Sequence, residues 1–202
     1  SHGELIVFGS AGTELSDLSK KDLRLNETQR AMLDAVTSNF ENVIVVFNTS
    51  NTMEMDWVEQ YDSIKAALLM WLPGQVGAES LGDVLSGKVN PSGKLTDSIA
   101  WSLSDYPTNR NFGNYQYDGT LPSILGKYFV DYEEGIYVGY RYFETFAPEK
   151  VQYPFGYGLS YTDFDWKVTG FSANASNVTV RVKVTNTGKR AGKDVVQVYF
   201  SA

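Results

Sequence analysis

The first third of the chain alternates short apolar runs with segments of helical spacing. Residues 5–8 (LIVF), 42–48 (NVIVVFN) and 64–71 (IKAALLMW) are continuous apolar runs of strand length. Such runs are typical of strands that are covered on both faces. Between the first two runs, Asn26 is followed three residues later by Gln29, which predicts a helix N-terminus with a capping box.

Two helices and one short helical piece are expected around these strands. Apolar side chains recur with helical spacing after the cap and predict the buried stripe of the first helix, at Met32, Ala35, Val36 and Phe40. A second helix is predicted near residues 76–86, ended by Gly87 at its C′ position. A short helical piece is expected around Trp57 to Tyr61. Strands that alternate with helices favour a parallel sheet with helices on both faces.

The last part of the chain has a different pattern. Valines 178, 180, 182 and 184 alternate strictly with polar residues, and residues 194–201 (DVVQVYFS) repeat the alternation. This period predicts antiparallel strands with one face open to water. About three strands fit from residue 164 onward, whereas a fibronectin-like sandwich has about seven. We therefore expect the start of an incomplete all-β domain over residues 164–202.

Between these parts the chain is rich in Gly, Pro, Tyr and Phe and shows little periodicity. We expect it to connect the two domains. The predicted organisation is an α/β domain over residues 1–110, a connecting segment over residues 111–163, and the all-β portion over residues 164–202.

Composition and charge exclude several classes of function. The 17 basic and 24 acidic residues give a net charge of −7 without a basic run, so neither nucleic acid nor an anionic membrane surface is expected as a partner. The longest apolar runs are shorter than the roughly 20 residues that span a bilayer. The absence of cysteine excludes disulfide and thiolate chemistry and favours a bacterial source. The pattern leaves cytoplasmic, periplasmic and secreted locations open.

Catalysis, if there is any, must use carboxylates, amides, hydroxyls or aromatic rings. The only histidine is His2, which excludes a Ser-His-Asp triad and a histidine-based metal site. We expect neither a cofactor nor a metal. The loop expected after residues 5–8 carries Glu14 and Asp17, and this pattern alone favours solvated charges over catalytic ones. A flavodoxin-like nucleotide binder is the weaker alternative, because no Gly-rich fingerprint follows the first predicted strand.

Three long motifs carry a resemblance to a known family. Residues 66–95, 132–143 (YEEGIYVGYRYF) and 154–164 (PFGYGLSYTDF) resemble, in order, the C-terminal half of glycoside hydrolase family 3, the β-glucosidase-like enzymes. The resemblance implies part of a three-layer α/β/α sandwich followed by the first strands of a fibronectin type III-like sandwich. It also implies a retaining β-glycosidase that acts on neutral β-linked sugars.

The resemblance further implies that two domains supply the two catalytic carboxylates. The nucleophilic aspartate would belong to a barrel domain outside this chain, on the same gene or on a separate chain. Thr13-Glu14 with Asp17 and a downstream Leu23-Arg24-Leu25 is similar to the family pattern that carries the general acid/base, which assigns that role to Glu14. Asp17 would shape the loop or add negative charge, and it is also a candidate for binding the substrate. Asp56, beside Trp57, is expected to be a non-catalytic acid at the start of a helix.

Aromatic residues crowd the connecting segment, and most are expected to pack in a core or an interface. Tyr115 and Tyr117, in the polar stretch NFGNYQYDG, are the best candidates for rings that stack on a sugar. The expected partners are a carbohydrate substrate and the barrel domain, and association of identical chains stays open. The alternative function is a non-catalytic carbohydrate-binding or structural module with the same fold.

Overall fold

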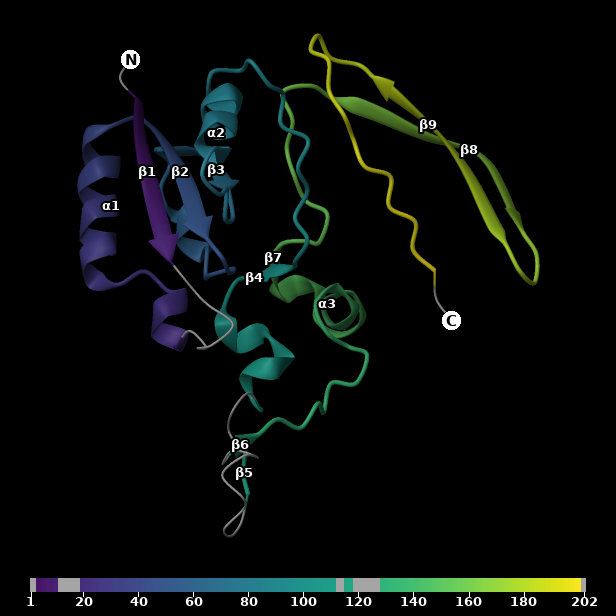
Figure 1. Cartoon of the computed structure of the whole chain (residues 1–202), viewed down its shortest axis with the longest axis horizontal. Coiled ribbons are helices and arrows are strands. Elements are labelled where there is room, and N and C mark those ends of the chain that lie inside the picture. Colours follow the sequence, from purple (N-terminus) through teal and green to yellow (C-terminus); the bar gives the residue numbers. More distant parts are fainter. Residues whose placement is uncertain (1–2, 11–18, 112–114, 118–127, 201–202) are drawn as a thin grey trace. The chain divides into compact units, whose positions relative to one another are not determined.

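The computed structural model describes residues 3–10, 19–111, 115–117 and 128–200. The chain divides into two compact units, drawn in Figure 1. The first unit contains Ser1–Gly74 and Asp97–Phe155, and the second contains Gln75–Thr96 and Gly156–Ala202. Each unit therefore combines two stretches that are far apart in the sequence. Within the described ranges, no helix has both the length and the apolar character needed to cross a bilayer.

A parallel sheet forms the centre of the first unit. Its strands are β1 (Gly3–Ser10), β2 (Asn42–Thr49) and β3 (Ile64–Leu69), in the order β1-β2-β3. All three predicted strands are present, and both pairings are parallel as expected. The central strand is covered on both faces, with Val45, Val46 and Phe47 almost completely buried. Successive side chains of a strand point to opposite faces, so burial of these consecutive residues requires cover on each side.

The outer strands are less covered than their apolar runs predicted. In β1, Ile6 is buried but Val7 is 51% exposed. In β3, the Ala66 and Ala67 side chains are exposed. The prediction that β1 is covered on both faces is therefore wrong for this chain. Successive side chains point to opposite faces, so Val7 lies on the face opposite Ile6, and the described residues leave that face open at Val7.

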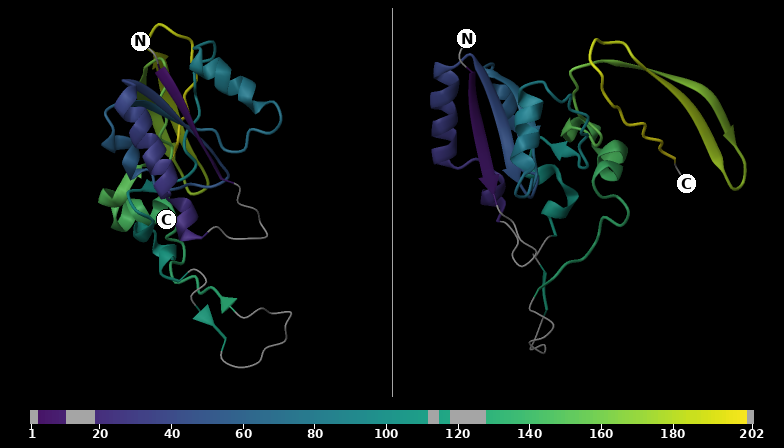
Figure 2. Two further views of the ribbon diagram at one scale, coloured as in Figure 1. Left: turned by 90° about the vertical axis from the view of Figure 1, so that its left-hand side faces the viewer. Right: turned by 45° about the horizontal axis from the view of Figure 1, so that its top comes forward.

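The first helix is α1 (Glu27–Asn39), which lies along β1 and β2 in Figures 1 and 2. Its predicted capping box is confirmed. Asn26 Oδ1 accepts from Gln29 N at 2.8 Å, and Gln29 Oε1 accepts from Asn26 N at 2.9 Å. The predicted stripe is wrong in part, because Met32 and Ala35 are exposed while Leu33 is fully buried. The inward face is formed by Leu33, Val36, Thr37 and Phe40.

Thr37 explains why the inward face of α1 contains a polar residue and therefore differs from the predicted apolar stripe. Its hydroxyl donates to the Leu33 carbonyl oxygen at 2.8 Å. This bond satisfies the hydroxyl within the helix, so a polar residue can face inward without a buried unpaired group. Leu33 can therefore serve as the residue that anchors α1 in the core.

The predicted helical piece after β2 is the 3-10 helix η2 (Asp56–Gln60). Met53, Met55, Trp57 and Val58 around it are buried. The Trp57 ring packs against Phe47 of β2, with ring centroids 5.7 Å apart. The segment is therefore fixed to the central strand by apolar packing.

The rest of the first unit consists of short elements around a small aromatic core. β4 (Ile99–Ala100) pairs antiparallel with β7 (Val151–Tyr153), and α3 (Tyr140–Phe146) is followed by η6 (Pro148–Lys150). Tyr106, between η3 (Leu103–Asp105) and η4 (Pro107–Asn109), packs edge-on against Phe143 with ring centroids 5.5 Å apart. Its hydroxyl donates to Ser98 O and accepts from Ala100 N, both at 3.0 Å.

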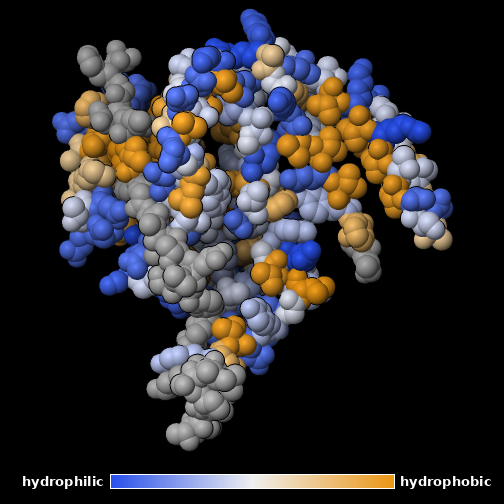
Figure 3. Space-filling model, viewed as in Figure 1, coloured by the Kyte–Doolittle hydropathy of each residue, from blue (hydrophilic) through white to orange (hydrophobic). Residues whose placement is uncertain are grey.

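The second unit contains α2 (Gly77–Leu85) and an antiparallel hairpin of β8 (Phe164–Ala173) and β9 (Val178–Asn186). Both the predicted helix with its terminal Gly87 and the predicted alternating strand are confirmed. With the parallel sheet of the first unit, this hairpin confirms the predicted fold class. Figure 3 shows apolar side chains along the hairpin, where Trp166, Val168 and Phe171 are exposed.

The alternation predicted over residues 194–201 does not produce a strand in its described part, residues 194–200. Within the part of the chain that the structure describes, residues 191–200 have no regular secondary structure. A strand is defined by hydrogen bonds to a neighbouring strand, and the two-stranded sheet of this unit contains only β8 and β9. The alternating pattern alone therefore does not make the described residues 194–200 a strand.

Candidate functional site

The two carboxylates singled out by the sequence, Glu14 and Asp17, lie outside the described residues. The structure does describe both flanks of the segment that carries them. β1 ends at Ser10, and the chain is described again from Ser19 onward. The site is therefore built from these flanks and from the residues that contact them.

The N-terminal flank is fixed by the parallel sheet. Gly9 pairs with Asn48 and Ser10 pairs with Thr49, so β1 and β2 end side by side. Ligands of open α/β sheets bind at this carboxyl edge. Thr49 is buried, and its hydroxyl donates to Asn51 O at 2.6 Å as the chain turns away from the sheet.

The C-terminal flank is a short capped turn, η1 (Lys20–Leu23). Asp22 Oδ2 accepts from the Ser19 hydroxyl at 2.7 Å and from Ser19 N at 3.2 Å. The hydroxyl bond is the main reason why the pKa of Asp22 lies below its ordinary value. Lys20 Nζ donates to Asn109 O at 3.2 Å, which ties this turn to η4. Local polar contacts thus define the chain direction from Ser19 to Leu23.

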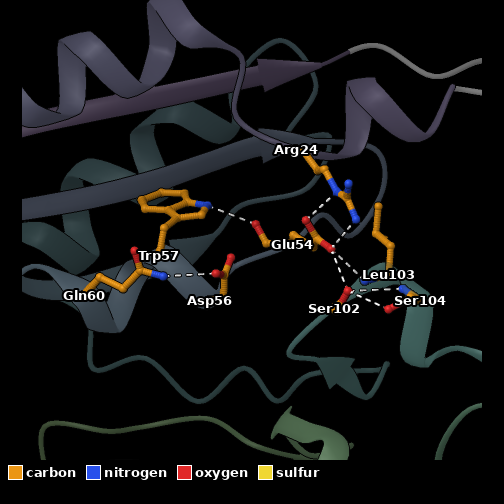
Figure 4. A network of polar contacts seen from close by, with 8 residues as sticks. All are labelled: Arg24, Glu54, Asp56, Trp57, Gln60, Ser102, Leu103 and Ser104. Carbon is orange, nitrogen blue, oxygen red and sulfur yellow. Dashed lines mark hydrogen bonds and ion pairs between the residues drawn. The ribbon is translucent and has the colours of Figure 1, made fainter.

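Glu54 connects this flank to two other parts of the unit, as Figure 4 shows. Its backbone N donates to Leu23 O at 2.9 Å. Its carboxylate meets the Arg24 guanidinium through two contacts, Nε to Oε2 at 2.6 Å and Nη2 to Oε1 at 2.9 Å. Oε1 also accepts from Ser102 Oγ at 3.1 Å and from Leu103 N at 2.8 Å. One carboxylate therefore joins three stretches of chain.

The local sequence holds Glu54 in place for this role. The side chains of Met53 and Met55 on either side are buried. Trp57 Nε1 donates to Glu54 O at 2.9 Å, and its ring packs on β2. The backbone at Glu54 is consequently fixed relative to the end of β2.

The surroundings of Glu54 favour its charged form. Burial alone would raise its pKa, but hydrogen bonds from the Leu103 N–H, Arg24 and Ser102, with the charge of Arg24, outweigh that effect and lower the pKa below its ordinary value of 4.5. Its side chain is 14% exposed, compared with 51% for Arg24. The carboxylate of this ion pair is therefore largely buried, whereas the Arg24 side chain is about half exposed.

The predicted position of Asp56 at the start of a helix is confirmed, and its non-catalytic role stays a prediction. Asp56 lies in the first turn of η2, and its Oδ2 accepts from Gln60 Nε2 at 3.0 Å. This is the expected arrangement of an acid at a helix N-terminus.

The structure brings Tyr115 and Tyr117 together on one aromatic neighbour. They lie at β5 (Tyr115–Gln116), which pairs antiparallel with β6 (Tyr128–Phe129). Both rings pack on Phe129, with centroid distances of 5.2 and 4.8 Å respectively. The Tyr115 hydroxyl donates to the Glu133 carboxylate, and this bond is the main cause of the raised pKa of Tyr115. Tyr117 is exposed, so part of its ring is open to a ligand.

Sequence reasoning missed the polar network around Glu54. In the family pattern Arg24 occupies only the variable position between Leu23 and Leu25, and Glu54 is not part of that pattern. The available signal was a single carboxylate between two methionines in MEMDW, because an acid flanked by core residues needs partners. Among the described residues, no group of three or more His, Cys, Asp or Glu side chains is arranged to hold a metal ion.

Comparisons with known proteins cover almost the whole chain. Residues 4–161 match the model of the glycosyl hydrolase family 3 C-terminal domain. Beta-glucosidase A of Butyrivibrio fibrisolvens is 42% identical over 90% of this chain, and a beta-glucosidase of Ruminococcus albus is 38% identical over 98% of it. The chain spans 22% and 19% of these two relatives.

A solved structure gives the same result. The crystal structure of a beta-glucosidase from Paenibacillus barengoltzii matches with a TM-score of 0.81 and 41% sequence identity. The match covers 92% of this chain and 20% of that protein. Both kinds of comparison thus agree on the region matched, which is about a fifth of a longer polypeptide.

Proposed function

The chain belongs to glycosyl hydrolase family 3 and contains the C-terminal domain of that family. We propose that it is part of a retaining β-glycosidase. This enzyme hydrolyses the O-glycosidic bonds of β-glucosides or similar sugars. The observation that carries the proposal is the family match over residues 4–161, supported by the 42% identity to a beta-glucosidase. The chain spans about a fifth of that relative, so other parts of the enzyme belong to polypeptide outside it.

In this proposal the two catalytic carboxylates come from two domains. A barrel domain outside this chain supplies the nucleophilic aspartate, and this chain supplies Glu14 as general acid/base. The aspartate attacks the anomeric carbon while Glu14 gives its proton to the departing oxygen, so the sugar–oxygen bond breaks as the glycosyl-enzyme bond forms. Glu14 then takes a proton from the water that releases the sugar with retention.

The proposed role sets a requirement on the pKa of Glu14. The side chain must be protonated when the substrate is bound, and cover by the barrel domain would raise its pKa by removing water. Negative charge from Asp17 acts in the same direction. Tyr115 and Tyr117 are proposed to contact the substrate, which the exposure of Tyr117 supports. The division into residues 1–110, 111–163 and 164–202 is part of the same proposal.

The test uses the complete enzyme that carries this chain, with Glu14→Gln and two classes of β-glucoside. Aryl glucosides with a good leaving group need little protonation, whereas alkyl glucosides depend on it. We expect Glu14→Gln to slow alkyl glucosides about 10²- to 10⁴-fold, the usual contribution of general acid catalysis, and aryl glucosides much less. Azide should restore activity to Glu14→Ala and yield a glycosyl azide.

Glu27→Gln is the matched control, because Glu27 is an exposed glutamate in the first turn of α1. It should leave both substrates unaffected. Equal loss on both substrates in Glu14→Gln would assign the acid to another residue. A complete protein that binds glucosides without cleaving them would instead support a non-catalytic carbohydrate-binding module.

A further inference from the structure

Both flanks of residues 11–18 are tied to the same short stretch of chain. On one side, Ser10 pairs with Thr49 in the parallel ladder. On the other side, Leu23 O accepts from Glu54 N at 2.9 Å, and Arg24 forms its two contacts with the Glu54 carboxylate. Thr49 and Glu54 belong to the end of β2 and the turn that follows. One fixed segment therefore sets the distance between the two flanks.

We propose that Arg24 and Glu54 are a positioning pair that fixes the flank following Glu14, and thereby sets how well Glu14 delivers its proton. This inference rests on the proposed function of Glu14. Neither residue is assigned any contact with the substrate. Their effect is on the geometry of residues 19–25, which directly follow the segment with the acid.

The contact geometry suits a positioning role. A guanidinium that meets both oxygens of a carboxylate fixes orientation as well as distance, which a lysine cannot do. The other bonds of Glu54, from Ser102 and Leu103, hold the carboxylate itself in place. Arg24 thus binds to a group that is already fixed from the opposite side.

The expected effect on the rate is larger than the expected effect on stability, which separates a positioning role from simple stabilisation. Ion pairs with an exposed partner contribute little to stability, and Arg24 is 51% exposed. By contrast, a shift of about 1 Å in a catalytic group can lower the rate about 10²-fold. Loss of the pair should therefore affect proton transfer more than it affects folding.

The charge of Glu54 is compatible with the proposed chemistry. Glu14 must be protonated while the pair must stay ionised. The Leu103, Arg24 and Ser102 hydrogen bonds outweigh the effect of burial and keep the pKa of Glu54 below its ordinary value. The pair is consequently retained at a pH where an ordinary glutamate begins to take up protons.

The chain offers a closely matched control. Lys150 Nζ lies 3.2 Å from Asp105 Oδ1, and their side chains are 49% and 14% exposed, nearly the same as Arg24 and Glu54. This pair links η6 to Asp105, the last residue of η3, and its contact includes neither Arg24 nor Glu54. Removal of Lys150 reproduces the electrostatic loss without the proposed positioning effect.

The experiment compares Arg24→Ala, Arg24→Lys, Glu54→Gln and Lys150→Ala in the complete enzyme. Thermal unfolding and the kcat and KM for alkyl and aryl glucosides are measured for each. For Arg24→Ala we expect a drop of about 10-fold in kcat on alkyl glucosides, less than about 3-fold on aryl glucosides, and little change in KM. Arg24→Lys should recover part of the loss, and Lys150→Ala should not distinguish the substrates.

Several results would overturn the inference. Equal fractional loss on both substrates in Arg24→Ala would mean that the pair only supports folding, and an unchanged alkyl rate would mean that it has no role. If Arg24→Ala does not fold, Glu54→Gln and Arg24→Lys give the same comparison. The double variant Arg24→Ala with Glu54→Gln should lose no more than Arg24→Ala alone, and additive losses would contradict a shared effect.

Glu14→Gln measured alongside separates the two proposals. If it selectively slows alkyl glucosides but Arg24→Ala does not, only the positioning inference fails. If Glu14→Gln shows no such selectivity, the assigned role of Glu14 fails, and the inference fails with it.

Discussion

Alanine substitutions at two glycines near the end of α2 are expected to change stability in opposite directions. Gly82 lies inside the helix and is exposed, and a Cβ added there would have no atom within 4 Å. Gly82→Ala therefore changes only the backbone term. Alanine is favoured over glycine inside helices by about 1 kcal/mol, so this variant should be more stable by about that amount.

Gly87 has the opposite requirement. Its φ of +73° lies in the left-handed region, and its N–H donates to Val84 O at 2.9 Å to close the helix. An alanine in this conformation costs about 1 kcal/mol. Its Cβ would also lie 3.0 Å from Arg190 Nη1, which donates to Gly87 O at 2.8 Å. Gly87→Ala should therefore be less stable by at least the backbone cost.

The two variants should differ by about 2 kcal/mol, which corresponds to roughly 4–8 °C in Tm for a chain of about 200 residues. Urea and thermal unfolding of the chain, followed by circular dichroism, measure this difference. Gly87→Ala combined with Arg190→Ala isolates the backbone term, because the side-chain contact is then removed. Stabilisation by both substitutions, or a Gly87→Ala variant as stable as the parent, would refute the reasoning about the helix end.

Three further outcomes are expected from unfolding measurements. Tyr106→Phe should cost about 1–3 kcal/mol in denaturant unfolding, because two backbone groups lose the hydroxyl that pairs with them. Leu33→Ala should cost about 2–5 kcal/mol since Leu33 is fully buried, while Met32→Ala, at an exposed position of the same helix, should change stability by less than about 0.5 kcal/mol. The lowered pKa of Glu54 means that its charged form stabilises the fold above pH 4.5, and that this contribution is lost as the pH falls through the folded-state pKa. The parent should therefore lose more stability between pH 7 and pH 3 than Glu54→Gln does. An equal loss in both proteins would contradict the lowered pKa of Glu54.

Features with a local cause were predictable from the sequence. The capping box of α1 depends on Asn26 and Gln29 alone, and the three apolar runs became the three strands of the sheet. Which faces are covered depends on neighbours that the local pattern does not contain. Val7 is exposed although its run resembles that of β2, because its side chain points to the face opposite Ile6 and the described residues do not cover that face at Val7.

The polar network could not be predicted from local sequence. Glu54 finds Arg24 and Ser102 at separations of 30 and 48 residues. Neither spacing is encoded in a motif, and only the turn after β2 brings the three residues together. Residues 194–201 illustrate the same limit, because a correct alternation needs a paired neighbour before it becomes a strand.

The proposed mechanism requires opposite protonation states of two glutamates in one chain, a charged Glu54 and a protonated Glu14. Glu54 accepts from two protein N–H and O–H donors besides its guanidinium partner, and this set of partners stabilises the carboxylate. A proton donor needs the reverse, an environment that removes water without supplying such partners. For Glu14, that cover would come from the barrel domain rather than from this chain. The proposed mechanism therefore requires a pH range in which Glu14 is protonated while the Arg24–Glu54 pair remains charged, and the lowered pKa of Glu54 favours the charged pair.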